Sequence, residues 1–115
     1  MNSRIILISA LVTLNACSNA ISPIVGTWLS EDNVDEFIIA KQADKFQVSF
    51  SSRGENQGIY PAEATEKQIT FNINLGFLNG HYNCSLTTVD EMDCNLTANT
   101  LLASQTQSVK LIRKK

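Results

Sequence analysis

Histidine is almost absent from this sequence, since His81 is the only one among 115 residues. Metal centres and most acid–base catalytic sites need histidines, cysteines or carboxylates in defined arrangements, and no hydrolase or metal-binding motif surrounds His81. Because it stands beside Asn79-Gly80, we interpret it as an exposed turn residue. The sequence therefore predicts no enzyme, no metal site and no cofactor.

An excess of positive charge and a long apolar run are missing too. Nine Lys and Arg stand against eleven Asp and Glu, a net charge of -2. Nucleic-acid binding normally needs a basic face, so no nucleic-acid partner is expected. The apolar run from Ile5 to Val12 is too short to cross a bilayer, which takes about 20 residues. The basic cluster Arg113-Lys114-Lys115 is interpreted as a solvated tail.

The N-terminal segment has the features of a targeting signal. Arg4 precedes the apolar stretch, and Leu14-Asn15-Ala16-Cys17 follows it. This ending resembles the bacterial lipobox, with a branched apolar residue three places before the cysteine and a small residue directly before it. The resemblance implies cleavage before Cys17, a diacylglyceryl group on its sulfur and acylation of the new amine. Residues 1–16 are then a lipoprotein signal peptide, and residues 17–23 are a lipidated tether.

Lipidation at Cys17 makes the membrane a partner of this protein. Two or more acyl chains anchor a protein stably, since each buried methylene contributes about 0.8 kcal/mol. In lipoproteins of this kind an aspartate after the cysteine favours inner-membrane retention, and here the residue is Ser18. The resemblance thus predicts the outer membrane, with the domain facing the periplasm. The alternative is an ordinary cleaved signal with Cys17 as a spare thiol, but one lipidated and two paired cysteines leave none over.

The rest of the chain alternates short β-favouring segments with turn residues at a spacing of roughly ten residues, which is typical of meandering sandwiches and barrels. Helical periodicity is hard to find. The strands expected from alternation and turn signals are residues 24–29, 37–39, 46–50, 59–64, 69–78, 81–87, 91–97 and 108–113. Residues 24–115 are therefore predicted to form one all-β domain, an antiparallel meander of about eight strands closing into a barrel or a sandwich.

Asn79-Gly80 is the strongest hairpin signal in the chain, because both central residues of a type I′ turn need positive φ. A two-residue turn at this place predicts three apolar cross-strand pairs: Phe77 with Tyr82, Leu75 with Cys84, and Ile73 with Leu86. A slip by one residue would set these side chains against polar partners. The turn and the hydrophobic pattern therefore predict the same register.

The following hairpin is predicted from the two remaining cysteines. If Cys84 and Cys94 lie directly opposite, Leu86 faces Met92 and Tyr82 faces Leu96, with residues 88–90 as the loop. The inward face then stays apolar across three strands. A disulfide fits such a closely approaching cross-strand pair, whereas catalytic cysteine pairs usually lie two residues apart at a helix start. We therefore predict a structural Cys84–Cys94 disulfide.

Acidic residues gather at two places, Glu31-Asp32 with Asp35-Glu36 and Asp90-Glu91 with Asp93. Calcium sites need six to eight oxygens from a shaped loop, and neither cluster has the spacing of an EF-hand. We interpret both clusters as solvated turn charges.

Gly26-Thr27-Trp28, preceded by Ile24-Val25, resembles the Gly-x-Trp segment that opens the first strand of lipocalins and of smaller lipocalin-like barrels. In that family the tryptophan packs at the closed end, and an arginine near the C-terminus often stacks on it. The resemblance implies that Trp28 and Arg113 form a structural plug through a cation–π contact of about 0.5–2 kcal/mol. Lipocalins proper are longer and their later motifs are absent here, so Trp28 as an ordinary core aromatic is the alternative.

Two functions from different classes fit these observations. The first is a lipid-anchored, periplasm-facing binding or structural module of the cell envelope that recognises a small apolar ligand or an envelope protein. Six aromatic side chains could line its pocket or fill its core: Phe37, Phe46, Phe50, Phe71, Phe77 and Tyr82. The alternative is an enzyme inhibitor, because Ser51-Ser52-Arg53-Gly54 loosely resembles the inhibitory loop of periplasmic lysozyme inhibitors, which are small disulfide-bonded β-barrel lipoproteins.

Overall fold

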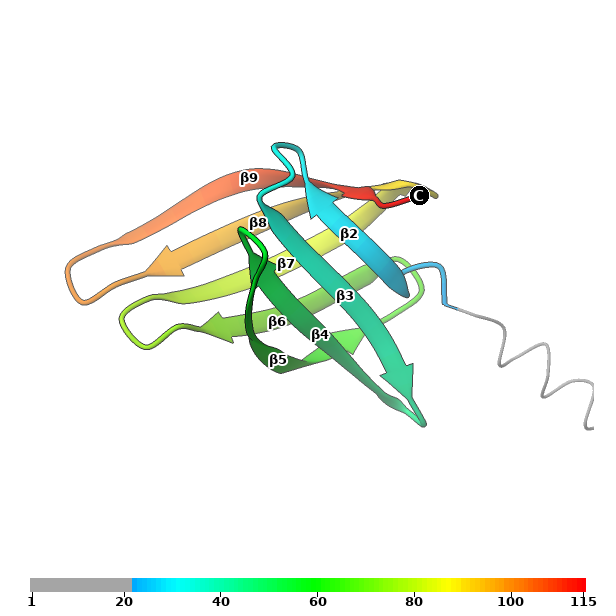
Figure 1. Ribbon diagram of the computed structural model, residues 1–115, viewed down its shortest axis with the longest axis horizontal. Coiled ribbons are helices and arrows are strands. Elements are labelled where there is room, and N and C mark those ends of the chain that lie inside the picture. Colours follow the sequence, from blue (N-terminus) through cyan, green and yellow to red (C-terminus); the bar gives the residue numbers. More distant parts are fainter. Residues whose placement is uncertain (1–21) are drawn as a thin grey trace, which may run out of the picture.

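Eight antiparallel strands follow one another around a closed barrel in the computed structural model, which describes residues 22–115 (Figure 1). The strands are β2 (Gly26–Ser30), β3 (Asp35–Gln42), β4 (Lys45–Ser52), β5 (Glu55–Ala64), β6 (Gln68–Asn74), β7 (Asn79–Thr88), β8 (Glu91–Asn99) and β9 (Ser104–Arg113). Each strand pairs with its neighbours in the chain, and β9 returns to β2. The predicted all-β meander is confirmed, and of its two architectures the barrel forms. The predicted signal peptide and Cys17, the predicted lipidation site, lie outside the described residues.

Alternation along the strands places one apolar face inside the barrel. In β6, for example, Ile69, Phe71 and Ile73 are buried, while Gln68 and Asn72 between and beside them are exposed. Fully burying one such side chain contributes about 1.5–3 kcal/mol. The core collects fourteen buried residues from seven of the eight strands and from the turn before β2, and β5 adds the partly buried Tyr60, Ala62 and Ala64.

The β6–β7 hairpin pairs in a register that differs from the predicted one. Phe71 lies opposite Tyr82 and Ile73 lies opposite Gly80, so the predicted turn at Asn79-Gly80 is wrong and both residues belong to β7. The chain instead turns at residues 75–78, where the Leu75 N–H donates to the Leu78 carbonyl at 2.9 Å.

Two local features explain this turn. Gly76 has a φ of 89°, a left-handed conformation that glycine adopts without strain, and its N–H donates to the Asn74 side-chain oxygen at 2.8 Å. The observed register also brings Ile69 into the core, whereas the predicted one would have placed it beyond the end of β7. Both registers turn the same face of β6 inward, so the face assignment of Ile73 holds, but Phe77 becomes 78% exposed.

The β7–β8 hairpin has the predicted register. Cys84 pairs with Cys94, Leu86 with Met92, and Tyr82 with Leu96. The Cys84–Cys94 disulfide is confirmed, with a Cα–Cα distance of 3.9 Å, and both cysteines are buried in the core. One covalent bond therefore joins two adjacent strands inside the barrel.

The last two strands are longer than predicted. The ladder between β8 and β9 continues to Asn99 and Ser104, through residues whose side chains are mostly exposed. These polar positions pair with their neighbour strand but have little core to face, which is why alternation did not reveal them. Leu101 and Leu102 lie in the connecting turn, 100% and 95% exposed.

The barrel has two unlike ends. The closed end, on the right of Figure 1, holds the start of β2, the end of β9 and the β3–β4, β5–β6 and β7–β8 turns. The open end holds the four other turns, of which β6–β7 and β8–β9 project to the left (Figure 1). The closure of the barrel is short, because β2 and β9 share three residue pairs, from Trp28 with Arg113 to Ser30 with Leu111.

Candidate functional site

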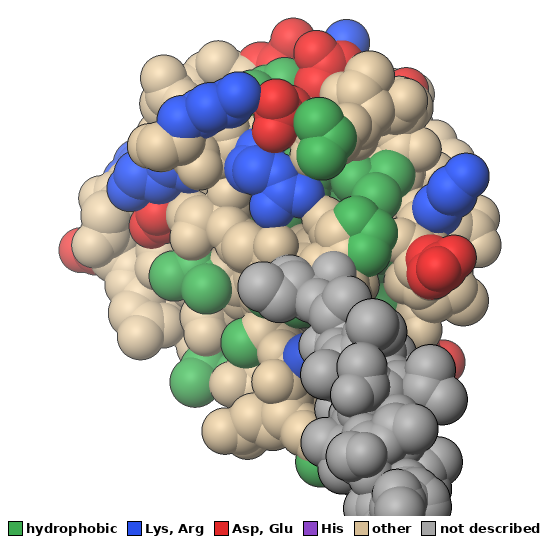
Figure 2. Space-filling view, turned by 90° about the vertical axis from the view of Figure 1, so that its right-hand side faces the viewer, with side chains coloured by type: hydrophobic (Ala, Val, Ile, Leu, Met, Phe, Trp, Pro, Cys, Tyr) green, Lys and Arg blue, Asp and Glu red, His purple; other side chains and the backbone are tan. Residues whose placement is uncertain are grey.

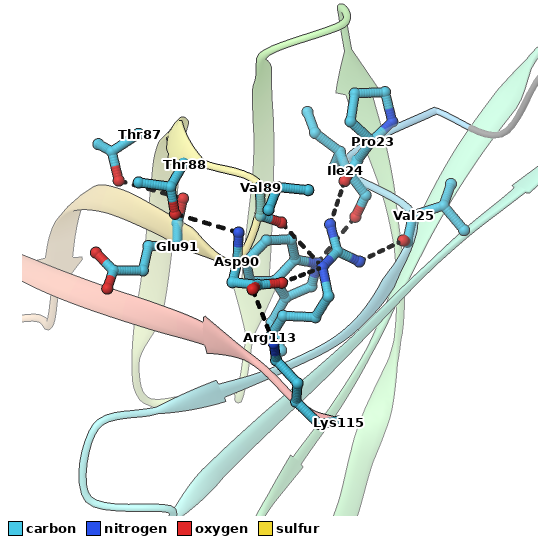
Figure 3. Close-up of polar contacts among 11 residues, drawn as sticks. Pro23, Ile24, Val25, Thr87, Thr88, Val89, Asp90, Glu91, Arg113 and Lys115 are labelled. Atoms are coloured by element: carbon cyan, nitrogen blue, oxygen red, sulfur yellow. Dashed lines mark hydrogen bonds and ion pairs between the residues drawn. The ribbon is translucent and has the colours of Figure 1, made fainter.

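The closed end is filled by Trp28 and Arg113. Figure 3 shows Arg113 between the segment before β2 and the β7–β8 turn. Trp28 is fully buried, and its indole N–H donates to the Ile24 carbonyl at 2.9 Å. The Arg113 guanidinium carbon lies 4.4 Å from the Trp28 ring centroid. The guanidinium also donates to the carbonyls of Pro23, Val25 and Val89. One arginine thus joins the segment before β2, the β7–β8 turn and the core.

Gly26 explains why the Gly-x-Trp segment needs its glycine. A Cβ at this position would lie 2.6 Å from Nη1 of Arg113, and the φ of Gly26 is 144°. Both the space and the backbone conformation therefore exclude a side chain. The glycine lets the guanidinium pass across the strand to reach Val25.

The outer face of the closed end carries charges of both signs. The Asp90 carboxylate forms ion pairs with Arg113 at 3.5 Å and with Lys115 at 2.9 Å. Lys114 forms an ion pair with Glu36 at 3.4 Å. Figure 2, which views this end, shows basic, acidic and apolar side chains interspersed on it. The C-terminal basic cluster is therefore paired with acids, and its Arg113 is built into the closed end instead of belonging to a solvated tail.

The open end contains a cleft of about 640 Å³ that is bounded by six different strands, β3 to β8, and the β6–β7 turn. Its apolar lining is Phe50, Ile73, Leu75, Phe77, Leu78, Tyr82, Leu96 and Ala98, and its polar lining includes Asp35, Ser52 and Gln57. Pockets of this size, mostly apolar with a few converging polar groups, are the usual form of small-molecule sites. We take this open-end cleft as the candidate functional site.

Four aromatic rings pack together around and beneath the open-end cleft. Phe71 and Tyr82 are stacked, with ring centroids 4.9 Å apart and planes at 9°. Phe37 contacts three rings, those of Phe50 at 5.0 Å, Tyr82 at 5.3 Å and Phe71 at 6.0 Å. Offset and edge-to-face pairs of this kind contribute about 0.5–1.5 kcal/mol beyond their buried area. The cleft therefore has an aromatic wall, in which Phe50 and Tyr82 line the cleft and Phe37 and Phe71 pack against them.

Tyr82 and Asp35 are the polar groups that adjoin this aromatic wall. Burial, together with the nearby Asp35 carboxylate, raises the pKa of Tyr82 to about 12, so its phenol is neutral at physiological pH. Asp35 is half-buried, and its Oδ1 accepts a hydrogen bond from the Ser52 hydroxyl at 2.8 Å. Both residues also line a second, adjoining cleft of about 290 Å³ between β2 and β9.

Asp32 differs from Asp35 although both were predicted to be solvated turn charges. Asp32 is exposed in the β2–β3 turn, where hydrogen bonds from the Ser30 hydroxyl and the Val34 N–H lower the pKa of its carboxyl. That part of the prediction holds. For Asp35 it is wrong, because the first residue of β3 directs its side chain toward the open-end cleft.

His81 lies on the outer surface of β7 and not in a turn. Its Nδ1 is 2.7 Å from the Asn72 side-chain oxygen of β6, and it borders an outer cleft of about 850 Å³ together with Lys45 and Glu63. His81, Lys45 and Glu63 are all exposed, and none of the polar residues that line this cleft is buried. The outer cleft therefore fits a ligand-binding site less well than the open-end cleft does.

Within residues 22–115, no three or more His, Cys, Asp or Glu side chains gather in a way that could hold a metal ion. The same residues contain no helix with the length and apolarity to cross a membrane.

Fold and cleft together define an eight-stranded up-and-down β-barrel with a filled end and an end that opens on a cleft. No protein-family model and no curated protein matches the sequence. Among solved structures, the barrel is similar to Treponema pallidum Tp0751 (Pallilysin), with a TM-score of 0.51 and 8% sequence identity over 97% of this chain and 98% of that one. At this identity the likeness concerns the fold alone.

Proposed function

We propose that this protein is a lipid-anchored binding module of the cell envelope, held at the outer membrane by acylated Cys17 and facing the periplasm, whose open-end cleft takes up an apolar ligand. The observation that carries the proposal is the cleft itself, an apolar hollow against an aromatic wall at one end of a barrel whose other end is filled by Trp28 and Arg113.

A neutral aromatic probe tests the binding function. We expect 2-phenylethanol, titrated into the full-length chain in nonionic detergent, to shift the NMR signals of Ile73, Leu96 and Ala98, which line the open-end cleft. Signals of Ile24 and Leu111, which are buried in the core, should stay in place.

Filling the cleft should abolish these shifts. Ala98→Trp places an indole in the open-end cleft, and Ala103→Trp places the same side chain in the exposed β8–β9 turn as a matched control. Equal binding by both variants would contradict a site in this cleft.

Acylation is tested separately by growing cells that express the protein with radioactive palmitate. We expect label in the wild-type chain and none in Cys17→Ala, because the acyl chains depend on that residue. Unchanged labelling of the variant would contradict the anchor and the outer-membrane location while leaving the cleft experiment intact.

A second candidate is the lysozyme-type inhibitor, which one observation favours. Ser51 and Ser52 end β4, and Arg53 and Gly54 form the β4–β5 turn at the open end, both exposed and both at positive φ. An inhibitor of this type would slow lysozyme at stoichiometric concentration, and Arg53→Ala would relieve the inhibition. Full lysozyme activity in the presence of excess protein would dismiss this candidate.

A further inference from the structure

The Tyr82 hydroxyl is a buried polar group that has no hydrogen-bond partner among residues 22–115. Tyr82 is 7% exposed, and it lines both the open-end cleft and the adjoining cleft between β2 and β9. A buried hydroxyl without a partner destabilises the folded state, and native structures usually provide a partner, from protein or from water. A polar group that enters the cleft from solvent can supply the missing bond.

Asp35 places a negative charge next to this hydroxyl. The carboxylate forms no ion pair within the described part of the chain, although its Oδ1 is bonded to Ser52. Lys110 lines the adjoining cleft, but its Nζ lies 3.9 Å from Glu91 on the neighbouring strand. The cleft thus presents a half-buried acceptor with free lone pairs, and it disfavours any ligand that carries a negative charge.

Tyr82 offers a second acceptor to a positively charged group. Its ring packs against those of Phe71 at 4.9 Å and Phe37 at 5.3 Å, so its phenol oxygen is the part left to meet a ligand. Tyr82 and Asp35 line the same clefts. An ammonium group between Asp35 and Tyr82 could donate to the carboxylate and to the phenol oxygen.

We propose that the open-end cleft selects an organic amine, a ligand with an apolar body and a protonated nitrogen. Its body packs on the apolar lining around Ile73 and Leu96, and its ammonium group bonds to Asp35 and Tyr82. This inference rests on the proposed binding function and names the class of ligand that the site takes.

Three small probes with one aromatic body test the charge preference on the full-length chain in nonionic detergent. They are 2-phenylethylamine, 2-phenylethanol and 3-phenylpropionate, which are cationic, neutral and anionic at pH 7. We expect the amine to bind about tenfold more tightly than the alcohol, since one half-buried ion pair with its hydrogen bond contributes on the order of a factor of ten. The acid should bind more weakly than the alcohol.

Asp35→Asn should remove the difference between amine and alcohol, because the amide keeps the bond to Ser52 but loses the charge. Asp93→Asn is the matched control on the outer face of β8, where the same change of charge should leave the preference intact. Tyr82→Phe keeps the ring and should weaken amine binding severalfold. The unaltered chain offers a measurement that needs no variant, since raising the ionic strength from about 0.05 M to about 1 M should reduce the preference.

The outcomes separate the two proposals. If the alcohol binds as tightly as the amine, or if Asp35→Asn keeps the preference, the amine inference is wrong and the binding function stands. If none of the three probes binds, both are wrong.

Discussion

At the scale of single residues, Tyr82 is a titratable side chain that is buried among aromatic neighbours. Its ring packs against Phe37 and Phe71, and Asp35 lines the same clefts at the open end. An ionised phenol would lose hydration and meet a like charge, which is why its pKa rises to about 12.

This raised pKa predicts how stability depends on alkaline pH. Because the folded-state pKa lies above the value of about 10 in the unfolded chain, the stabilisation is complete below pH 10 and is lost as the pH rises from about 10 to about 12. The loss should amount to roughly 2–3 kcal/mol in urea unfolding experiments. Tyr82→Phe should abolish this pH dependence, and an unchanged profile in that variant would contradict the assignment.

Arg113 is the residue on which the closed end depends. It donates to three backbone carbonyls, each worth about 0.5–1.5 kcal/mol, and stacks on Trp28 for about 0.5–2 kcal/mol. Arg113→Ala should therefore lower the free energy of unfolding by about 2–4 kcal/mol, measured with urea. Lys114→Ala removes a neighbouring charge in an exposed pair and should cost less than about 1 kcal/mol. Equal losses in the two variants would argue against a plug.

At the scale of elements, the two hairpins that share β7 show where sequence patterns suffice. The β7–β8 register followed from the cysteines, because a disulfide and an apolar face both constrain it. The β6–β7 register did not follow from Asn79-Gly80. The observed turn around Gly76 lies three residues earlier in the chain, and only packing of the whole strand distinguishes the two positions.

The turn at Gly76 predicts an asymmetry between two substitutions. Gly76→Val forces a β-branched side chain into positive φ and should destabilise the protein by about 1–3 kcal/mol. Asn79→Thr changes an exposed strand position, so it should alter stability by less than about 0.5 kcal/mol. Thermal unfolding of both variants measures the difference. If Asn79→Thr were instead the more destabilising substitution, the turn would have to lie at Asn79-Gly80.

At the scale of the whole molecule, the two ends of the barrel differ in their position relative to the start of the described chain. The described chain begins at the closed end, so a tether of residues 17–23 would leave from the end opposite the cleft. If Cys17 is acylated, the filled end faces the bilayer and the cleft faces the periplasm. An apolar rim with Phe77, Leu101 and Leu102 exposed then lies on the side away from the membrane.

This orientation predicts that the two ends of the barrel lie at unequal distances from the lipid headgroups. A fluorophore at Asp44→Cys, in the β3–β4 turn on the tether side, should be quenched by headgroup-nitroxide lipids more strongly than one at Ala103→Cys, in the β8–β9 turn. The full-length acylated chain in vesicles is the sample, and both labelled residues are exposed. Stronger quenching at residue 103 would show that the cleft faces the membrane.

The sequence by itself determined the all-β class, the inward face of the strands and the disulfide hairpin, because alternation and cross-strand pairing act between residues close in the chain. The same applies to Gly26 and Trp28, whose motif is local. Tertiary structure alone decided that the sheet closes as a barrel, since closure depends on three pairs between the first and last strands. It also decided that Asp35, predicted to be solvated, meets Tyr82 at the cleft, because β3 and β7 become neighbours across the interior only when the barrel is closed.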